Sequence, residues 1–372
     1  MARDFAAPGG VAQSEPGLKA LWLFGPRRDL AIVGIPIVLV AIAAIVEAVG
    51  GSSAADDANR LARWTATNIL GNGTHVILTF LMFQLRPETM RSTPTIRVQI
   101  YLGIFLMLLV STGFFLLHRW EPQASVYARA LVFAIFGMHH TLSQNRGWWS
   151  LHNLRERTAG LTPAAEEPRL QRLLVPFNLT LILIRYFFVS ASSTTPEPFV
   201  DLGQPALMPL SGVMVLLLLG LAYWAVVFRV VLRSPTRSSG KLLYLGVVAG
   251  AVALTIVSPI WGTVLFAGMH GLEYYFLSAR MMEQREGDPK QVSNAVIWPL
   301  MIASMLPFTL MGVVTLLRED GNMLEAFAQT WVWAVLVTIS TATVLAHYWA
   351  DALIYRFRLP TVRKVMLNRL GL

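Results

Sequence analysis

Two pairs of a histidine and a carboxylate recur at helical spacing within apolar stretches of this chain. His270 and Glu273 lie three residues apart, and His347 and Asp351 lie four residues apart. Either spacing places both side chains on one face of a helix. Imidazole and carboxylate together suit iron, manganese or zinc, and iron is favoured where dioxygen chemistry is required. The two pairs therefore predict helices that present metal ligands on a shared face.

Further histidines stand on comparable apolar segments. One segment carries a polar stripe at helical spacing, formed by Asn68, Asn72, His75 and Thr79. Another segment ends with the adjacent pair His139 and His140. Neighbouring residues on a helix point about 100° apart, so the two histidines of this pair cannot both bind one ion, and either of them could be the ligand.

These patterns define a candidate metal site, because ionisable residues within spanning segments are costly and usually functional. The candidate ligands are His75, His139, His140, His270, Glu273, His347 and Asp351. The carboxylates could also orient the histidines without binding the metal. Polar residues expected to support the ligands by hydrogen bonds are Asn72, Gln144 and His152. Tyr274 and Tyr348 are candidate catalytic residues that could donate a hydrogen bond or a proton.

The composition places these residues in a membrane protein without thiol chemistry. The 372 residues are 55% hydrophobic and 14% charged, with no cysteine. Soluble domains average about 45–50% apolar and about 25% charged residues. The absence of cysteine excludes disulfides, thiolate metal sites and thiol nucleophiles. Histidine and carboxylate therefore remain as the strong metal ligands.

The elements that must position the site are membrane-spanning helices. A helix needs about 20 mostly apolar residues to cross a bilayer. Ten segments qualify, namely 30–50, 68–85, 98–118, 126–145, 173–193, 207–228, 242–257, 260–279, 294–317 and 327–355. The seventh and eighth form either a tight hairpin or one broken element, because only Ser258 and Pro259 separate them. We predict an all-α, polytopic membrane bundle of about ten transmembrane helices.

The distribution of positive charge predicts the orientation of this bundle. Most of the 30 Lys and Arg residues fall in alternate loops, which are cytoplasmic if the N-terminus is cytoplasmic. Both termini are then predicted to be cytoplasmic, and the net charge of +9 reports topology instead of nucleic-acid binding. The predicted organisation is a cytoplasmic segment 1–29 with an interfacial helix over 18–24, a transmembrane domain 30–357 and a basic cytoplasmic tail 358–372.

In chain order, the histidine stations resemble those of bacterial Brp/Blh-type membrane β-carotene dioxygenases and other multi-histidine membrane oxygenases. The stations are Gly71 to His75, Phe136 to His139, Phe266 to His270, and His347 through Asp351 to Tyr355 and Arg356. The resemblance covers four short patches. It implies a histidine-bound non-haem iron that activates dioxygen, and it does not specify carotene as the substrate.

The sequence therefore predicts a non-haem iron oxygenase or oxidase of the bacterial inner membrane. The expected cofactor is one or two iron ions, with dioxygen as co-substrate and a lipophilic substrate such as a carotenoid, lipid or hydrocarbon. Expected partners are membrane lipids and either an electron-donor protein or further copies of the chain. Two alternatives remain: a haem-binding electron-transfer or haem-modifying protein, and a proton-coupled transporter. Hydrolase and nucleotide-binding motifs such as Gly-x-Ser-x-Gly and Walker A are absent from the chain.

Overall fold

The structure is a computed structural model that describes most of the chain. The described residues are 17–19, 21–49, 61, 65–85, 94–188, 211–234, 236–282, 294–317, 323–354, 364, 367, 368 and 370. Residues 1–16 lie outside this described part, as do Tyr355, Arg356 and most of the predicted cytoplasmic tail 358–372.

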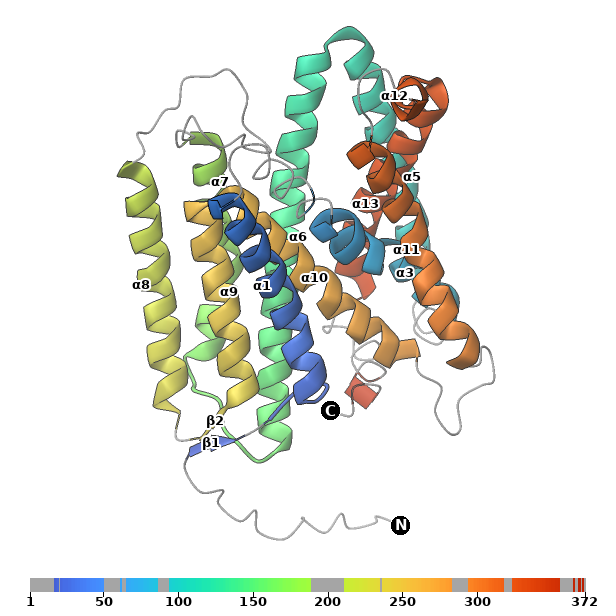
Figure 1. The fold of residues 1–372 in the computed structure, drawn as a ribbon. Coiled ribbons are helices and arrows are strands. Elements are labelled where there is room, and N and C mark those ends of the chain that lie inside the picture. Colours follow the sequence, from blue (N-terminus) through green and yellow to red (C-terminus); the bar gives the residue numbers. More distant parts are fainter. Residues whose placement is uncertain are drawn as a thin grey trace, which may run out of the picture.

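Helices occupy all ten of the predicted spanning segments (Figure 1). Their bounds are α1 Pro26–Val49, the π-helix η1 Thr65–Gly71 continuing into α3 Asn72–Leu85, α5 Pro94–Trp120, α6 Pro122–Thr158, α7 Glu167–Phe188, α8 Ser211–Arg233, α9 Ser239–Val257, α10 Pro259–Met282, α11 Asn294–Leu317, α12 Met323–Ala328 and α13 Trp331–Ile354. Two short strands are the other regular elements of the described part. The predicted all-α class is confirmed.

Six helices in the described part are long and apolar enough to cross a membrane. They are Pro26–Val46, Thr95–Trp120, Glu167–Phe188, Ser211–Arg233, Ser239–Val257 and Trp331–Leu353. A shorter apolar helix covers Pro299–Val314. Many of their large apolar side chains face outward, as expected of surfaces in contact with lipid. The chain therefore has the character of a multi-pass membrane protein.

The helices α3, α6 and α10 are not among the six, and each of them carries polar residues of the candidate site.

Helices α6 and α10 lie between two groups of helices (Figure 1). On one side, α7 packs against α6, and α9 packs against α7, α8 and α10. On the other side, α13 packs against α5 and α3, while α11 packs against α3. Helix α10 also contacts α1, η1 and α3. The histidine-bearing helices α3, α6, α10 and α13 therefore meet in the middle of the bundle.

Helices α9 and α10 form a tight hairpin. Helix α9 ends at Val257, and α10 begins at Pro259. The backbone amide of Ser258 bonds to the carbonyl of Leu254, and that of Gly262 bonds to the carbonyl of Ser258. A Cβ atom at Gly262 would collide with the backbone of Thr255, so glycine permits this close approach. The sequence allowed either a tight hairpin or one broken element, and the structure has the hairpin of two packed helices.

The N-terminal segment forms a strand where the sequence predicted an interfacial helix. Strand β1, Gly17–Lys19, pairs in parallel with β2, Thr236–Ser238. The Ser238 hydroxyl also donates to the carbonyl of Leu21 at 2.9 Å. Pairing with β2 requires an extended backbone, and residues 21–25 are not helical either. This segment is thus attached to the junction between α8 and α9.

A buried ionic cluster holds the same end of the bundle together. The Lys241 ammonium donates to Glu156 at 2.6 Å, to Glu167 at 3.1 Å and to Asn153 at 3.1 Å. Trp149 donates to Glu167 at 3.0 Å. Burial raises the pKa of Glu156, which lies beyond the predicted span 126–145, while Lys241 opposes that rise. The cluster joins α6, α7 and α9 by contacts that a buried ammonium requires.

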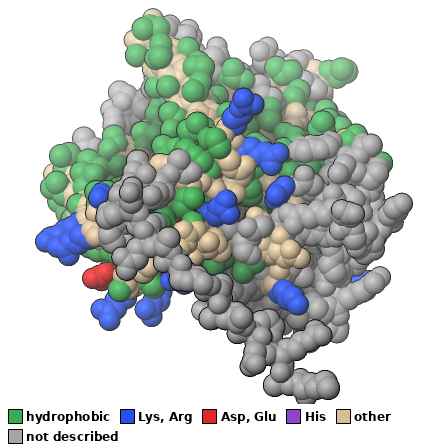
Figure 2. Space-filling model, turned by 90° about the horizontal axis from the view of Figure 1, so that it is seen from below, with side chains coloured by type: hydrophobic (Ala, Val, Ile, Leu, Met, Phe, Trp, Pro, Cys, Tyr) green, Lys and Arg blue, Asp and Glu red, His purple; other side chains and the backbone are tan. Residues whose placement is uncertain are grey.

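Basic side chains gather on this end of the molecule. Figure 2 shows the face from below, with Lys and Arg side chains spread over it. Exposed arginines at the helix ends nearest β1 and β2 are Arg27, Arg28, Arg157, Arg169, Arg172 and Arg233. Such a basic end is what the positive-inside rule associates with the cytoplasmic face of a membrane protein.

Candidate metal centre

Four histidines from four helices converge at one point inside the bundle. They are His75 on α3, His140 on α6, His270 on α10 and His347 on α13. One ligand atom from each lies within 4.8 Å of those of all the others. His75, His270 and His347 are at most 5% exposed. A cluster of four histidines with this spacing could bind a metal ion.

The ring nitrogens of this cluster have the separations expected of ligands to one ion. Nε2 of His75 lies 3.0 Å from Nε2 of His270 and 3.1 Å from Nε2 of His347. With metal–nitrogen bonds of about 2.1 Å, neighbouring ligand nitrogens of one ion are about 3.0 to 3.4 Å apart. Two metals would instead need centres about 3.5–4 Å apart, each with its own ligands. The four histidines therefore fit a single ion.

The hydrogen bond made by Nδ1 of His75 determines which tautomer of this histidine is present. Nδ1 of His75 lies 2.6 Å from the carbonyl oxygen of Gly71, which can only accept, so Nδ1 carries the proton. Nε2 then presents its lone pair to the other histidines, as a metal ligand does. Gly71 is the last residue of η1, and π-helical turns frequently occur at functional sites. The end of η1 thus orients the ligand on α3.

The Asp351 carboxylate supports the cluster from beside His140. Its Oδ1 accepts hydrogen bonds of 3.1 Å from Thr79 and from Tyr274. Its Oδ2 lies 3.4 Å from Nε2 of His140. Asp351 lies one helical turn after His347 on α13. Asp351 is not one of the four gathered ligands, and its carboxylate lies beside the ring of His140.

Glu273 on α10, like Asp351 on α13, is a buried carboxylate close in sequence to a histidine of the cluster. Gln144 of α6 donates to Glu273 Oε2 at 2.7 Å and to the carbonyl of His270 at 3.0 Å. Gln144 therefore supports a ligand helix by hydrogen bonds, as the sequence predicted. Glu273 is fully buried and outside the group of four ligand atoms. The carboxylate and the amide together hold α10 in place next to His270.

Both candidate catalytic tyrosines lie against the histidine rings. The ring centroid of Tyr274 is 4.9 Å from that of His75, and its hydroxyl oxygen lies 2.8 Å from the hydroxyl oxygen of Thr79. Tyr348 lies 4.7 Å from His140 and 4.3 Å from His347 between centroids. Each could therefore donate a hydrogen bond close to the cluster.

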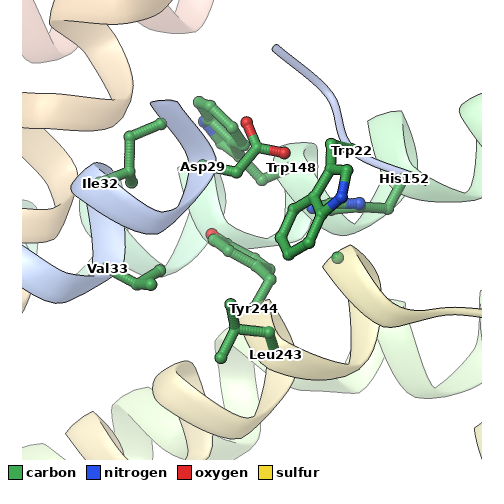
Figure 3. A pocket seen from close by; sticks show the side chains of 9 residues that line it. Trp22, Asp29, Ile32, Val33, Trp148, His152, Leu243 and Tyr244 are labelled. Atoms are coloured by element: carbon green, nitrogen blue, oxygen red, sulfur yellow. The ribbon is translucent and has the colours of Figure 1, made fainter. Parts of the chain in front are cut away.

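Three other predicted site residues are not members of the histidine cluster. His139 is exposed, because it points about 100° away from His140 on α6. Asn72 is half-buried and makes no hydrogen bond to the cluster among the described residues. His152 lies on a water-sized pocket of about 10 Å³ near Trp22 and Asp29, against the ring of Tyr244 (Figure 3). Burial and the nearby Lys241 lower the pKa of His152 to about 3, so this residue is neutral at pH 7.

A large cavity of about 1300 Å³ leads to the cluster. His140, Tyr274, Tyr348 and Asp351 form part of its wall. Most of its other lining residues come from α6, with contributions from α5, α7 and α13. Apart from His139, His140, Gln144, Tyr274, Tyr348 and Asp351, the residues of this wall could not be predicted from the sequence, because no spacing rule joins α5, α6 and α13. Thr79 was visible in the polar stripe, one turn after His75, but its bond to Asp351 depends on the tertiary fold.

Comparison with known proteins gives no relative for this fold and site: no family model, curated protein or solved structure matches the chain.

Proposed function

We propose that this chain is a multi-pass membrane oxygenase or oxidase that holds one iron ion on His75, His140, His270 and His347. The observation that carries the proposal is the convergence of four imidazoles, one of which, His140, lines a cavity of about 1300 Å³. Bound iron would supply the binding and reduction of dioxygen at this position. The cavity would admit a lipophilic substrate such as a lipid, hydrocarbon or carotenoid.

The protein residues would prepare the site in three ways. The carbonyl of Gly71 keeps Nδ1 of His75 protonated, so that Nε2 is available as a ligand. Thr79 and Tyr274 hold Asp351 beside His140, and Gln144 holds Glu273 beside His270. Tyr348 and Tyr274 stand where they could deliver a proton to a reacting group. The apolar surroundings would keep bulk water from the cluster.

The proposed topology has ten spans with both termini in the cytoplasm of a bacterial cell, in its inner membrane. Ten helical segments coincide with the ten apolar stretches of the sequence. The ends of α6 and α8 and the starts of α1, α7 and α9 share the basic face of Figure 2. That arrangement supports a cytoplasmic position for this face. An electron-donor protein would then approach from the cytoplasm.

Two alternative functions fit the cluster less well. A haem needs its axial nitrogens on opposite faces of the macrocycle, about 4 Å apart. The 3.0 and 3.1 Å separations around Nε2 of His75 leave no room for a macrocycle. A proton-coupled transporter would use the histidines as a relay, and four imidazoles facing a common centre are arranged for one ion instead.

The test is elemental analysis of purified full-length protein from cells grown with iron. We expect about one iron per chain in the wild type, and strong loss in single alanine variants of the four histidines. His139→Ala is the matched control, since this exposed histidine adjoins His140 and should leave the iron content unchanged. Wild-type protein without stoichiometric transition metal would overturn the proposal. A Soret band would indicate haem, and proton-driven flux in proteoliposomes abolished by His270→Ala would indicate a transporter.

A further inference from the structure

The large cavity changes character along helix α6. The apolar end is lined by Val132 and Phe136 of α6 together with Met107 and Val110 of α5. The next turns of α6 contribute His139, His140, Ser143 and Gln144 beside the cluster. Beyond the cluster, the lining from α6 and α7 includes the polar or basic residues Arg146, Ser150, Asn153, Arg157 and Gln171, interspersed with Trp148, Leu151, Leu154 and Pro168. One continuous space thus has an apolar end, a metal-binding wall and a basic end.

The two arginines at the basic end are available to a ligand. Arg146 and Arg157 are exposed, and in the described part of the chain no residue makes a hydrogen bond or ion pair with either side chain. Among the described residues of the cavity wall, Asp351 is the one acidic residue, and Thr79 and Tyr274 already hold its carboxylate. The basic end therefore has an unbalanced positive charge and polar side chains that could bind an anion.

The distances along α6 relate the basic end to the cluster. Arg146 follows His140 by six residues, which corresponds to about 9 Å along a helix, and Arg157 follows it by about 26 Å. Phe136 lies about 6 Å on the other side of His140. A ligand held by Arg146 would consequently extend past the cluster before it reached the apolar end.

We propose that the cavity binds an amphiphile with one anionic head group and a long apolar chain. Arg146 binds the carboxylate or phosphate of the head group, Arg157 adds positive charge farther along the basic end, and the chain passes His140 into the space between α5, α6 and α13. The cluster then meets the interior of the chain and not its ends. The assignment of this molecule as substrate rests on the proposed function, whereas its binding does not. An uncharged hydrocarbon or carotenoid would gain nothing from the arginines.

The experiment measures binding of oleate and of the uncharged oleyl alcohol to full-length protein in a non-ionic detergent. Quenching of tryptophan fluorescence can report binding, because Trp148 and Trp349 line the cavity. We expect the wild type to bind oleate at least about tenfold more tightly than the alcohol, equivalent to about 1.4 kcal/mol. Arg146→Gln should weaken oleate binding about tenfold, Arg157→Gln should weaken it less, and both should leave alcohol binding unchanged, while Arg146→Lys should retain most of the affinity.

Arg169→Gln is the matched control, because this arginine is exposed on α7 at the same end of the bundle and does not line the cavity. Equal affinities for oleate and the alcohol, or unchanged oleate binding in both glutamine variants, would overturn the proposal. Competition by phosphatidylglycerol but not phosphatidylcholine would support it with a phospholipid as the source of the anion, and failure of both to compete would support a free acid.

The metal-free His270→Ala variant separates this proposal from the proposed function. Charge-selective binding in the variant, or in a wild type that contains no metal, supports the amphiphile site regardless of the reaction. Iron bound by a wild type without charge selectivity would leave the proposed function standing and refute this inference.

Discussion

Gln144 on α6 bonds to Glu273 on α10 at 2.7 Å and, through the same amide nitrogen, to the backbone carbonyl of His270 at 3.0 Å. One side chain thereby contacts both members of the His270 and Glu273 pair. The bond joins the helix that carries His140 to the helix that carries His270. Because the histidines themselves come from separate helices, such links determine how closely the ligand atoms are held.

Gln144→Leu should weaken metal binding without removing it. Loss of a group that orients a metal ligand typically costs about 10–100-fold in affinity. Titration of the purified protein with a competing chelator will give the iron dissociation constant. Gln171→Leu is a suitable control, since Gln171 lines the same cavity from α7 and makes no contact with the cluster. Equal iron affinities for the two variants would show that Gln144 does not position His270.

Asp351→Asn should weaken iron binding more than Thr79→Val does. The aspartate lies 3.4 Å from Nε2 of His140 and offers a negative charge to a bound cation, which asparagine lacks. Thr79→Val removes one hydrogen bond to Asp351 and leaves the bond from Tyr274 in place. We expect a loss of about 10–100-fold for the first variant and a smaller loss for the second. The same chelator titration measures both, and the reverse order would mean that the charge of Asp351 is unimportant.

The positions of the helices, and the histidine and carboxylate pairs that share one helix, could be predicted from the sequence. Apolar runs must be buried or face lipid whatever their partners are, so all ten stretches could be found without tertiary information. Spacing also placed His270 with Glu273 and His347 with Asp351. It could not decide between His139 and His140, because the rotation of α6 about its axis depends on packing against α10 and α13. The strand β1 was missed for a similar reason, since its partner lies more than 200 residues away.

The ionic cluster around Lys241 was also beyond sequence reasoning. Its partners are 74 to 88 residues away along the chain, and no local pattern links them. Lys241→Met should destabilise the protein by about 3–5 kcal/mol, because it leaves Glu156 and Glu167 buried together without a cation. Glu156→Gln should cost much less, since one carboxylate still pairs with the ammonium. Thermal unfolding in detergent will compare them, and similar melting temperatures would contradict this account.

Gly262→Ala should destabilise the hairpin of α9 and α10. The new Cβ atom would collide with the backbone of Thr255, which cannot move without separating the helices. We expect a cost of about 1–3 kcal/mol, as for overpacking elsewhere. Gly246→Ala on α9 is the control, because a Cβ atom there meets nothing within 4 Å. That variant should be neutral or more stable by up to about 1 kcal/mol through its higher helix propensity. A lower melting temperature for Gly246→Ala than for Gly262→Ala would refute the close-approach argument.

The pH dependence of stability should differ between the wild type and Glu156→Gln. Burial, with a smaller contribution from Glu167, raises the pKa of Glu156 above its ordinary value of 4.5, while Lys241 opposes the rise. Between pH 4.5 and the raised pKa, Glu156 is protonated in the folded chain and ionised in the unfolded chain. Protonation of Glu156 therefore stabilises the folded chain. This stabilisation is complete below pH 4.5 and is lost as the pH rises through the raised pKa. Glutamine does not titrate. The melting temperature of the wild type relative to Glu156→Gln should therefore increase as the pH falls from 8 to about 5. Because the other titrating groups are common to both proteins, a constant or opposite difference would show that the pKa of Glu156 is not raised.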